Sequence, residues 1–204
     1  MKKIILGALL TALFGVAQAS TLTINNSSVI NFTGYSGQPL EVTGAYNTGF
    51  WGSLFSNIAG TFTATYLGNE SGLTNNFSFG LGNSLLESNR LGATISSSVG
   101  AGTIGFSFSG NNGTGSTFGP VNTFANGSQQ TLPLGFAILN GQSNRFGTFQ
   151  YLLGFNDSFT GDADYDDFVV GVNFSPVPEP ETYAMLLAGL GLIGYSARRR
   201  KMNS

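Results

Sequence analysis

The feature that most constrains the fold is the alternation of apolar and hydroxyl-bearing residues in short segments. Residues 61–67, TFTATYL, place Phe62, Ala64 and Tyr66 on one side of an extended chain and three threonines on the other. A period of two residues predicts a half-buried β-strand. Similar or shorter strand-like segments occur at residues 21–24, 29–32, 76–81, 103–108, 132–139, 146–155 and 168–174. The main part of the chain is therefore predicted to consist of strands.

Glycine and asparagine clusters separate these segments. Gly110–Gly113 and Asn126–Ser128 have the composition of turns, and glycine makes up 30 of the 204 residues. Only residues 84–91 are predicted to form a helical turn. Many short strands joined by such turns predict an all-β protein with a single antiparallel β-sandwich or jelly-roll-like domain. With 18 phenylalanines in the chain, we expect a core rich in that residue.

Charged residues are scarce, at 9% of the chain, and are unevenly distributed. Between residues 20 and 175 the basic residues are Arg90 and Arg145, against eight carboxylates, so this part carries a net charge of about −6. Nucleic-acid binding needs clustered Lys and Arg, so nucleic acid is not an expected partner. The chain contains neither Cys nor His.

The N-terminal segment, residues 1–19, is predicted to be a signal peptide. Lys2 and Lys3 precede an apolar run from Ile4 to Val16, and Ala17-Gln18-Ala19 has the small-x-small pattern of a cleavage site. The apolar run is too short to span a bilayer core of ~30 Å as a helix. We therefore expect export by the Sec route and cleavage by signal peptidase, which leaves a β-sandwich body at residues 20–175.

The C-terminal segment has three parts. Residues 176–181 are proline-rich and predict an extended spacer, since proline removes backbone donors. Residues 182–197 carry no charge over 16 positions and predict a short transmembrane helix of ~24 Å. Residues 198–204 begin with a basic cluster that would stay on the cytoplasmic side. This order predicts a body outside the inner membrane and a C-terminus inside.

Pro178-Glu179-Pro180, the glycine-containing hydrophobic stretch and Arg198-Arg199-Arg200 together resemble the PEP-CTERM sorting signal of Gram-negative bacteria. The resemblance covers about the last 27 residues. It implies that an exosortase recognises the tail, cuts near the Pro-Glu-Pro sequence and passes the body to the cell surface or extracellular matrix. Such tails usually accompany exopolysaccharide and biofilm production, so exopolysaccharide is an expected partner.

An acidic segment precedes the last predicted strand. Asp157, Asp162, Asp164, Asp166 and Asp167 lie within 11 positions and repel one another, which a hard cation such as Ca²⁺ would relieve. The spacing is not that of an EF-hand. The segment resembles a Gly-Asp-x-Asp-aromatic-acidic signature near the end of many secreted β domains. By that resemblance Asp162, Asp164, Asp166 and Asp167 are the matched positions, and Asp157 is a looser match. The alternative is a solvated acidic turn whose carboxylates cap loop amides.

The residue types argue against an enzyme. Nucleophilic catalysis normally uses His or Lys as a base, or Cys as a nucleophile, and residues 20–175 contain none of them. A matrix or adhesion role is therefore the first expectation. A polysaccharide-binding, lectin-like module is the alternative, with Tyr46 and Trp51 as candidates for stacking on sugars. A glycosidase that uses carboxylates alone is a more remote alternative.

Overall fold

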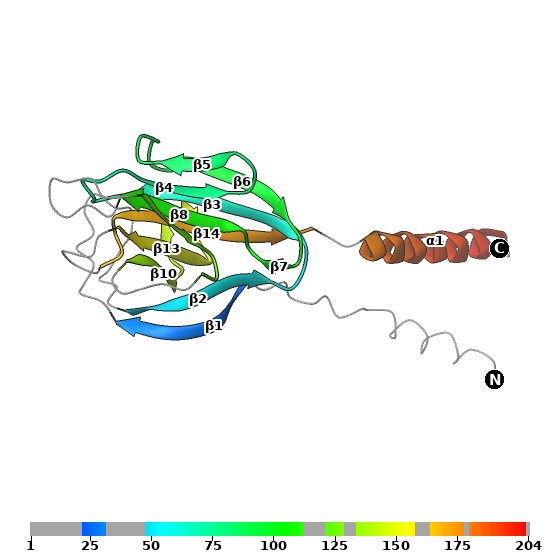
Figure 1. Cartoon of the computed structure of the whole chain (residues 1–204). Helices are drawn as coiled ribbons and strands as arrows, with labels where there is room; N and C mark the ends of the chain where they lie inside the picture. Colours follow the sequence, from blue (N-terminus) through cyan, green and yellow to red (C-terminus); the bar gives the residue numbers. More distant parts are fainter. Residues whose placement is uncertain are drawn as a thin grey trace.

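The computed structural model describes residues 22–31, 48–111, 121–128, 134–157, 164–177 and 180–202. Within these ranges the chain forms antiparallel sheets and one C-terminal helix, α1, at Pro180–Met202 (Figure 1). The strands are β1 (Leu22–Asn31), β2 (Thr48–Ser56), β3 (Gly60–Gly68), β4 (Asn75–Phe79), β5 (Asn83–Leu86), β6 (Thr94–Val99), β7 (Gly102–Thr103), β8 (Phe106–Asn111), β9 (Val121–Ala125), β10 (Gly135–Asn140), β11 (Ser143–Asn144), β12 (Gly147–Thr148), β13 (Tyr151–Asn156) and β14 (Phe168–Pro176).

The larger sheet has the strand order β1-β2-β10-β13-β14-β3-β6, and β7 adds to one edge of β2. Its centre is formed by β10, β13 and β14. Strand β14 also pairs antiparallel with β3, although β3 is about 100 residues before β14 in the sequence. Strand β1 contains a register shift between Asn25 and Ser28, and Asn26 has a φ of 53°. The bulge explains why residues 21–24 and 29–32, predicted as two strands, belong to one.

The smaller sheet has the order β5-β4-β8-β9 and shares a phenylalanine core with the larger sheet. Phe108 of β8 lies 5.2 Å from Phe155 and 5.6 Å from Phe136 between ring centroids. On the smaller sheet itself, Phe108 also meets Phe77 edge-on at 5.1 Å. These rings pack against one another across the space between the sheets and contribute apolar contact there. The predicted phenylalanine-rich core is confirmed.

A second apolar cluster covers the opposite face of the larger sheet. Side chains alternate between faces along a strand, so Leu139, Leu152 and Val169 lie opposite their neighbours in the phenylalanine core. Tyr165 packs on this cluster from the loop that precedes β14, and Trp51 contacts it from β2. The strands at the centre of the larger sheet are therefore buried on both faces, which explains their almost continuous apolar sequence.

The all-β, antiparallel class is confirmed, and most predicted strands are present with shifted ends. Residues 61–67 and 168–174 fall inside β3 and β14. The helical turn predicted at residues 84–91 is wrong, because Asn83–Leu86 pairs with β4 as strand β5. Strands β2, β6 and β9 were not predicted. Gly49 and Gly52 interrupt the apolar pattern in β2, and residues 94–99, TISSSV, have little apolar content.

The prediction of a transmembrane helix needs correction. The C-terminal helix is present, but no helix in the described part of the chain is both long and apolar enough to cross a membrane. The uncharged stretch is only 16 residues and includes Gly189, Gly191 and Gly194. Helix α1 reaches 23 residues by taking in Glu181 at one end and basic residues at the other. The predicted signal peptide at residues 1–19 lies outside the described residues.

Candidate functional site

The C-terminal tail follows the last strand with little intervening chain. Strand β14 ends at Pro176, and the Val177 N–H donates a hydrogen bond to the carbonyl oxygen of Ala59 at 3.1 Å. Pro180 is the first residue of α1, whereas Pro178 and Glu179 lie outside the described residues. The large apolar side chains of α1 are exposed, and Arg198, Arg199 and Arg200 are exposed near its C-terminal end. An exposed apolar helix of this kind indicates a segment that acts by contact with another apolar phase or partner.

The acidic residues gather at one end of the sheets, where three segments meet. Asp157 directly follows β13, and Asp164, Asp166 and Asp167 immediately precede β14. Glu70 follows β3 after one intervening residue, and its N–H donates to the carbonyl oxygen of Asp166 at 3.2 Å. The antiparallel pairing of β3 with β14 places the end of one strand beside the start of the other. The pairing therefore brings Glu70 to the aspartates.

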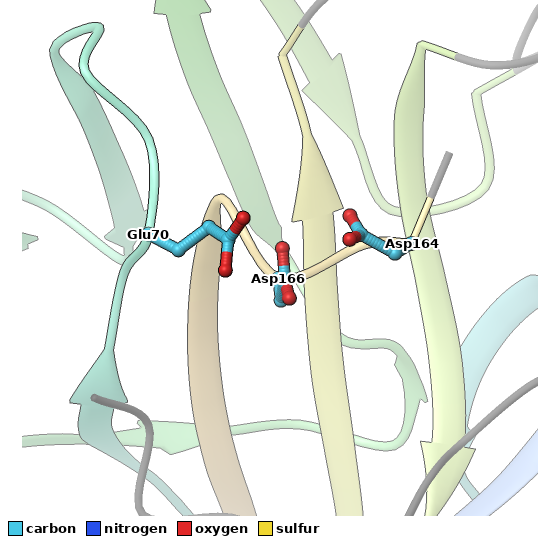
Figure 2. A group of neighbouring side chains, drawn as sticks. All are labelled: Glu70, Asp164 and Asp166. Atoms are coloured by element: carbon cyan, nitrogen blue, oxygen red, sulfur yellow. The ribbon is translucent and has the colours of Figure 1, made fainter. Parts of the chain in front are cut away.

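Three of these carboxylates form a candidate metal site. One carboxylate oxygen from each of Glu70, Asp164 and Asp166 lies within 4.8 Å of the others. Figure 2 shows the three side chains directed toward one another, Glu70 from the loop after β3 and both aspartates from the segment before β14. Asp164 is 3% exposed and Asp166 is fully buried, whereas Glu70 is exposed. Oxygen-only ligands at this spacing suit a hard cation such as Ca²⁺.

Asp157 and Asp167 belong to an internal hydrogen-bond network rather than to this trio. The Asp157 side chain accepts hydrogen bonds from Ser71 Oγ and from Asn75 Nδ2, both at 2.6 Å. Its backbone N–H donates to Asp167 Oδ2 at 2.8 Å. Burial raises the pKa of Asp167, and the neighbouring Asp157 charge raises it further. These contacts fix the loops on either side of the trio, as expected for carboxylates that cap loop amides.

Glu87 approaches the same network from the turn after β5. Its Oε1 atom accepts a hydrogen bond of 2.7 Å from the backbone N–H of Asn75. Partial burial raises the pKa of Glu87 to about 7, with the charge of Asp157 as a smaller cause in the same direction. Because the folded protein binds this proton more tightly than the unfolded chain does, Glu87 stabilises the fold below a pH of about 4.5, and that contribution is lost as the pH rises through about 7.

We therefore predict that Glu87→Gln reduces the pH dependence of stability between pH 4.5 and 7. The amide oxygen of glutamine still accepts the Asn75 N–H, while the ionisation is removed. The melting temperature of the variant should rise relative to the wild type as the pH increases, and thermal unfolding at several pH values measures this. Ser88→Ala is the control, since Ser88 is exposed in the same turn. If the difference in melting temperature between Glu87→Gln and the wild type stays the same across this pH range, the prediction is wrong.

The structure places the other predicted site residues as follows. Asp162 and Tyr46 lie outside the described residues. Trp51 is half-buried and packs against the apolar cluster on the outer face of the larger sheet, so only part of its ring is accessible. Glu70 was not included in the predicted metal set, because it lies 87 positions before Asp157. Only the pairing of β3 with β14 brings it to the aspartates.

The fold and the tail together define a class of protein: an antiparallel β body followed directly by an exposed apolar helix with a basic end. Comparison with protein families identifies the tail. A family model described as the PEP-CTERM protein-sorting motif matches residues 176–201, so the tail carries this sorting motif. No curated protein matches the chain. No solved structure matches it either.

Proposed function

We propose that the chain is an exported protein of the cell surface or extracellular matrix, in which the β body has a structural or adhesive role in an exopolysaccharide or biofilm matrix. The observation that carries the proposal is the PEP-CTERM motif at residues 176–201, which begins at the last residue of strand β14. The motif implies export, membrane-anchored processing and an exosortase as the processing partner. Removal of the tail at this position would leave every strand of the body in place.

Intact mass of the protein isolated from its native cells tests this proposal. The surface fraction should contain a form that lacks Arg198, Arg199 and Arg200, and a strain without exosortase should retain them. Replacement of Pro178, Glu179 and Pro180 by alanine should have the same effect as loss of the enzyme. A mature surface form that keeps the basic cluster in wild-type cells would contradict the sorting function.

We further propose that the body is not an enzyme and that Ca²⁺ is the candidate for its bound ion. Residues 20–175 contain no His, Cys or Lys, so any catalysis by the body would have to rely on carboxylates. Asp157 and Asp167 are engaged in hydrogen bonds with the loops, which favours a structural role for them. The polysaccharide-binding alternative has less support, because the ring of Trp51 is partly covered by the body itself.

The trio of Glu70, Asp164 and Asp166 is our proposal for a weak Ca²⁺ site that stabilises the fold. Its support is the approach of three carboxylate oxygens within 4.8 Å, two of them from almost completely buried side chains. For a Kd of roughly 10⁻⁴ to 10⁻³ M, as in many extracellular modules, about 5 mM Ca²⁺ would add roughly 1 to 2.3 kcal/mol to the free energy of unfolding.

Thermal unfolding in EGTA, in CaCl₂ and in NaCl of matched ionic strength measures this gain. Glu70→Gln should abolish the rise that is specific to Ca²⁺, and Glu70 is the member of the trio whose replacement disturbs the fold least, since it is exposed. The matched control is Glu87→Gln, which removes a carboxylate outside the trio. If CaCl₂ has no larger effect than NaCl on the wild type, the trio does not bind Ca²⁺ and its buried aspartates have a structural role only.

A further inference from the structure

Both ends of the β body lie beside the same turn. Leu22, the first residue of β1, pairs with Ser56, and Pro176, the last residue of β14, pairs with Gly60. Ser56 and Gly60 flank the turn that joins β2 to β3, and Val177 donates a hydrogen bond to Ala59 within that turn. Figure 1 shows β14 finishing at the end of the sheets from which α1 extends. The tail is therefore attached at the end of the body where the β2–β3 turn lies.

The tail begins close to this end whatever direction it takes. Three Cα–Cα steps separate Val177 from Pro180, so the start of α1 lies within about 11 Å of Val177. The beginning of an exposed apolar helix is thus held near the β2–β3 turn. A surface that binds the beginning of this helix therefore lies close to this part of the body.

In the part of the chain that the structure describes, the two turns and the strand end next to the tail are uncharged. A second turn, between β6 and β7, lies beside the first, because Gly60 pairs with Val99 and Ser56 pairs with Gly102. Residues 48–60, 94–105 and 168–177 contain no Asp, Glu, Lys or Arg. The exposed residues of the two turns, of the end of the last strand and of the residue after it define the end surface, which consists of Asn57, Ala59, Gly100, Ala101, Ser175, Pro176 and Val177.

The acidic groups are at the far end of the same strands. Strand β3 starts at Gly60, beside the end surface, and finishes at Gly68. The loop that follows carries Glu70, two residues after the end of the strand. Nine residues of strand separate the two ends by about 27 Å. Strand β14 repeats the arrangement in the opposite direction, from the aspartates at its start to the tail at its end. Among the described residues, the carboxylates of the body therefore lie at one end of the strand axis, and the two turns and the strand end beside the tail carry no charge.

We propose that the end surface lies against a phospholipid surface while the tail is attached, with the acidic end directed away from the membrane. The inference rests on the proposed function, since it requires membrane-anchored processing of the tail. Anionic lipid headgroups repel carboxylates over a distance of about 8–10 Å at ordinary ionic strength, so the uncharged end approaches them at the lowest electrostatic cost. The attachment of the tail at this end favours the same orientation, and it does not require α1 to cross the bilayer.

Single-cysteine labelling of the full chain tests the orientation, because the chain contains no cysteine of its own. Ala59→Cys and Ala101→Cys place a fluorophore on the end surface, and Ser88→Cys places one beside Glu87 at the acidic end. Each labelled chain is bound to vesicles of phosphatidylethanolamine and phosphatidylglycerol that contain a lipid with a nitroxide at its headgroup. Because about 27 Å of strand separates the two ends, quenching at Ala59 and Ala101 should exceed that at Ser88 at least about twofold.

Equal quenching at the three positions, or stronger quenching at Ser88, would overturn the inference. So would a full chain that does not float with the vesicles, because no lipid surface would then face the body. Vesicles without nitroxide give the reference intensity for each label. The proposed sorting function is tested separately by the mass of the processed form in cells, so that a normally processed protein with the wrong orientation would refute this inference alone.

Discussion

Replacement of Phe108 by alanine should lower the free energy of unfolding by about 3 to 5 kcal/mol. The side chain is fully buried between the two sheets, with ring contacts to Phe77 on its own sheet and to Phe136 and Phe155 on the other. Its removal leaves a cavity that rigid neighbouring strands cannot fill, so the transfer and cavity costs add. Denaturant unfolding of the full chain, followed by fluorescence of Trp51, measures the change in midpoint.

Phe124→Ala is the matched control for this prediction. Phe124 is half-buried on β9 at the edge of the smaller sheet, and its ring centroid is 5.9 Å from that of Phe155. Its loss removes less buried area and leaves space that solvent can enter, so the decrease in the free energy of unfolding should be clearly smaller. Equal losses for the two variants would show that Phe108 does not join the sheets as the structure indicates.

Gly154→Ala should also destabilise the fold, by about 1 to 3 kcal/mol or more, through overpacking. A Cβ atom at residue 154 would lie 2.2 Å from the carbonyl oxygen of Tyr165, and that oxygen belongs to backbone that cannot rotate away. Tyr165 is itself fully buried with a φ of 60°, between Asp164 and Asp166. The variant should therefore displace the acidic segment and reduce any stabilisation that Ca²⁺ gives.

The control for the glycine substitution is Gly72→Ala, near the same acidic end. A Cβ atom at residue 72 would have no neighbour within 4 Å, so the change should alter the free energy of unfolding by no more than about 0.5 kcal/mol. Denaturant midpoints for both variants, with and without CaCl₂, test the prediction. Similar midpoints for Gly154→Ala and the wild type would mean that the segment before β14 does not pack against β13.

The strands that the sequence predicts well are those with a strong apolar signal. Strand β3 alternates regularly, and β14 is a nearly continuous apolar run because both of its faces are buried. Strand β6 could not be found in this way, since its outward face consists of Thr94, Ser96 and Ser98 and its inward face is only half-buried. It is held instead by its pairing with β3 and by hydroxyl contacts such as Thr63 Oγ1 with Ser96 Oγ at 2.9 Å.

The candidate metal site was predictable only in part, because local sequence does not determine strand pairing. The aspartates near β14 are adjacent in sequence and were found as a group. Glu70 and Ser71 reach them from the loop between β3 and β4, and Asn75 reaches them from the start of β4. Nothing near residue 70 indicates which later strand β3 will join. Sequence reasoning also assigned Asp157 and Asp167 to a cation, whereas the structure gives them loop amides and hydroxyls as hydrogen-bond partners.

The position of both ends of the β body beside one turn also determines how the body responds to mechanical load. A protein held at its C-terminal end and pulled at its N-terminal end would transmit force between Leu22 and Pro176, which are attached to residues on either side of the β2–β3 turn. The force therefore acts across the strands rather than along them, and it opens the hydrogen bonds of β1 one after another, starting at Leu22. Strand β1 would peel away at low force, while β14, between β13 and β3, would keep the rest of the body folded.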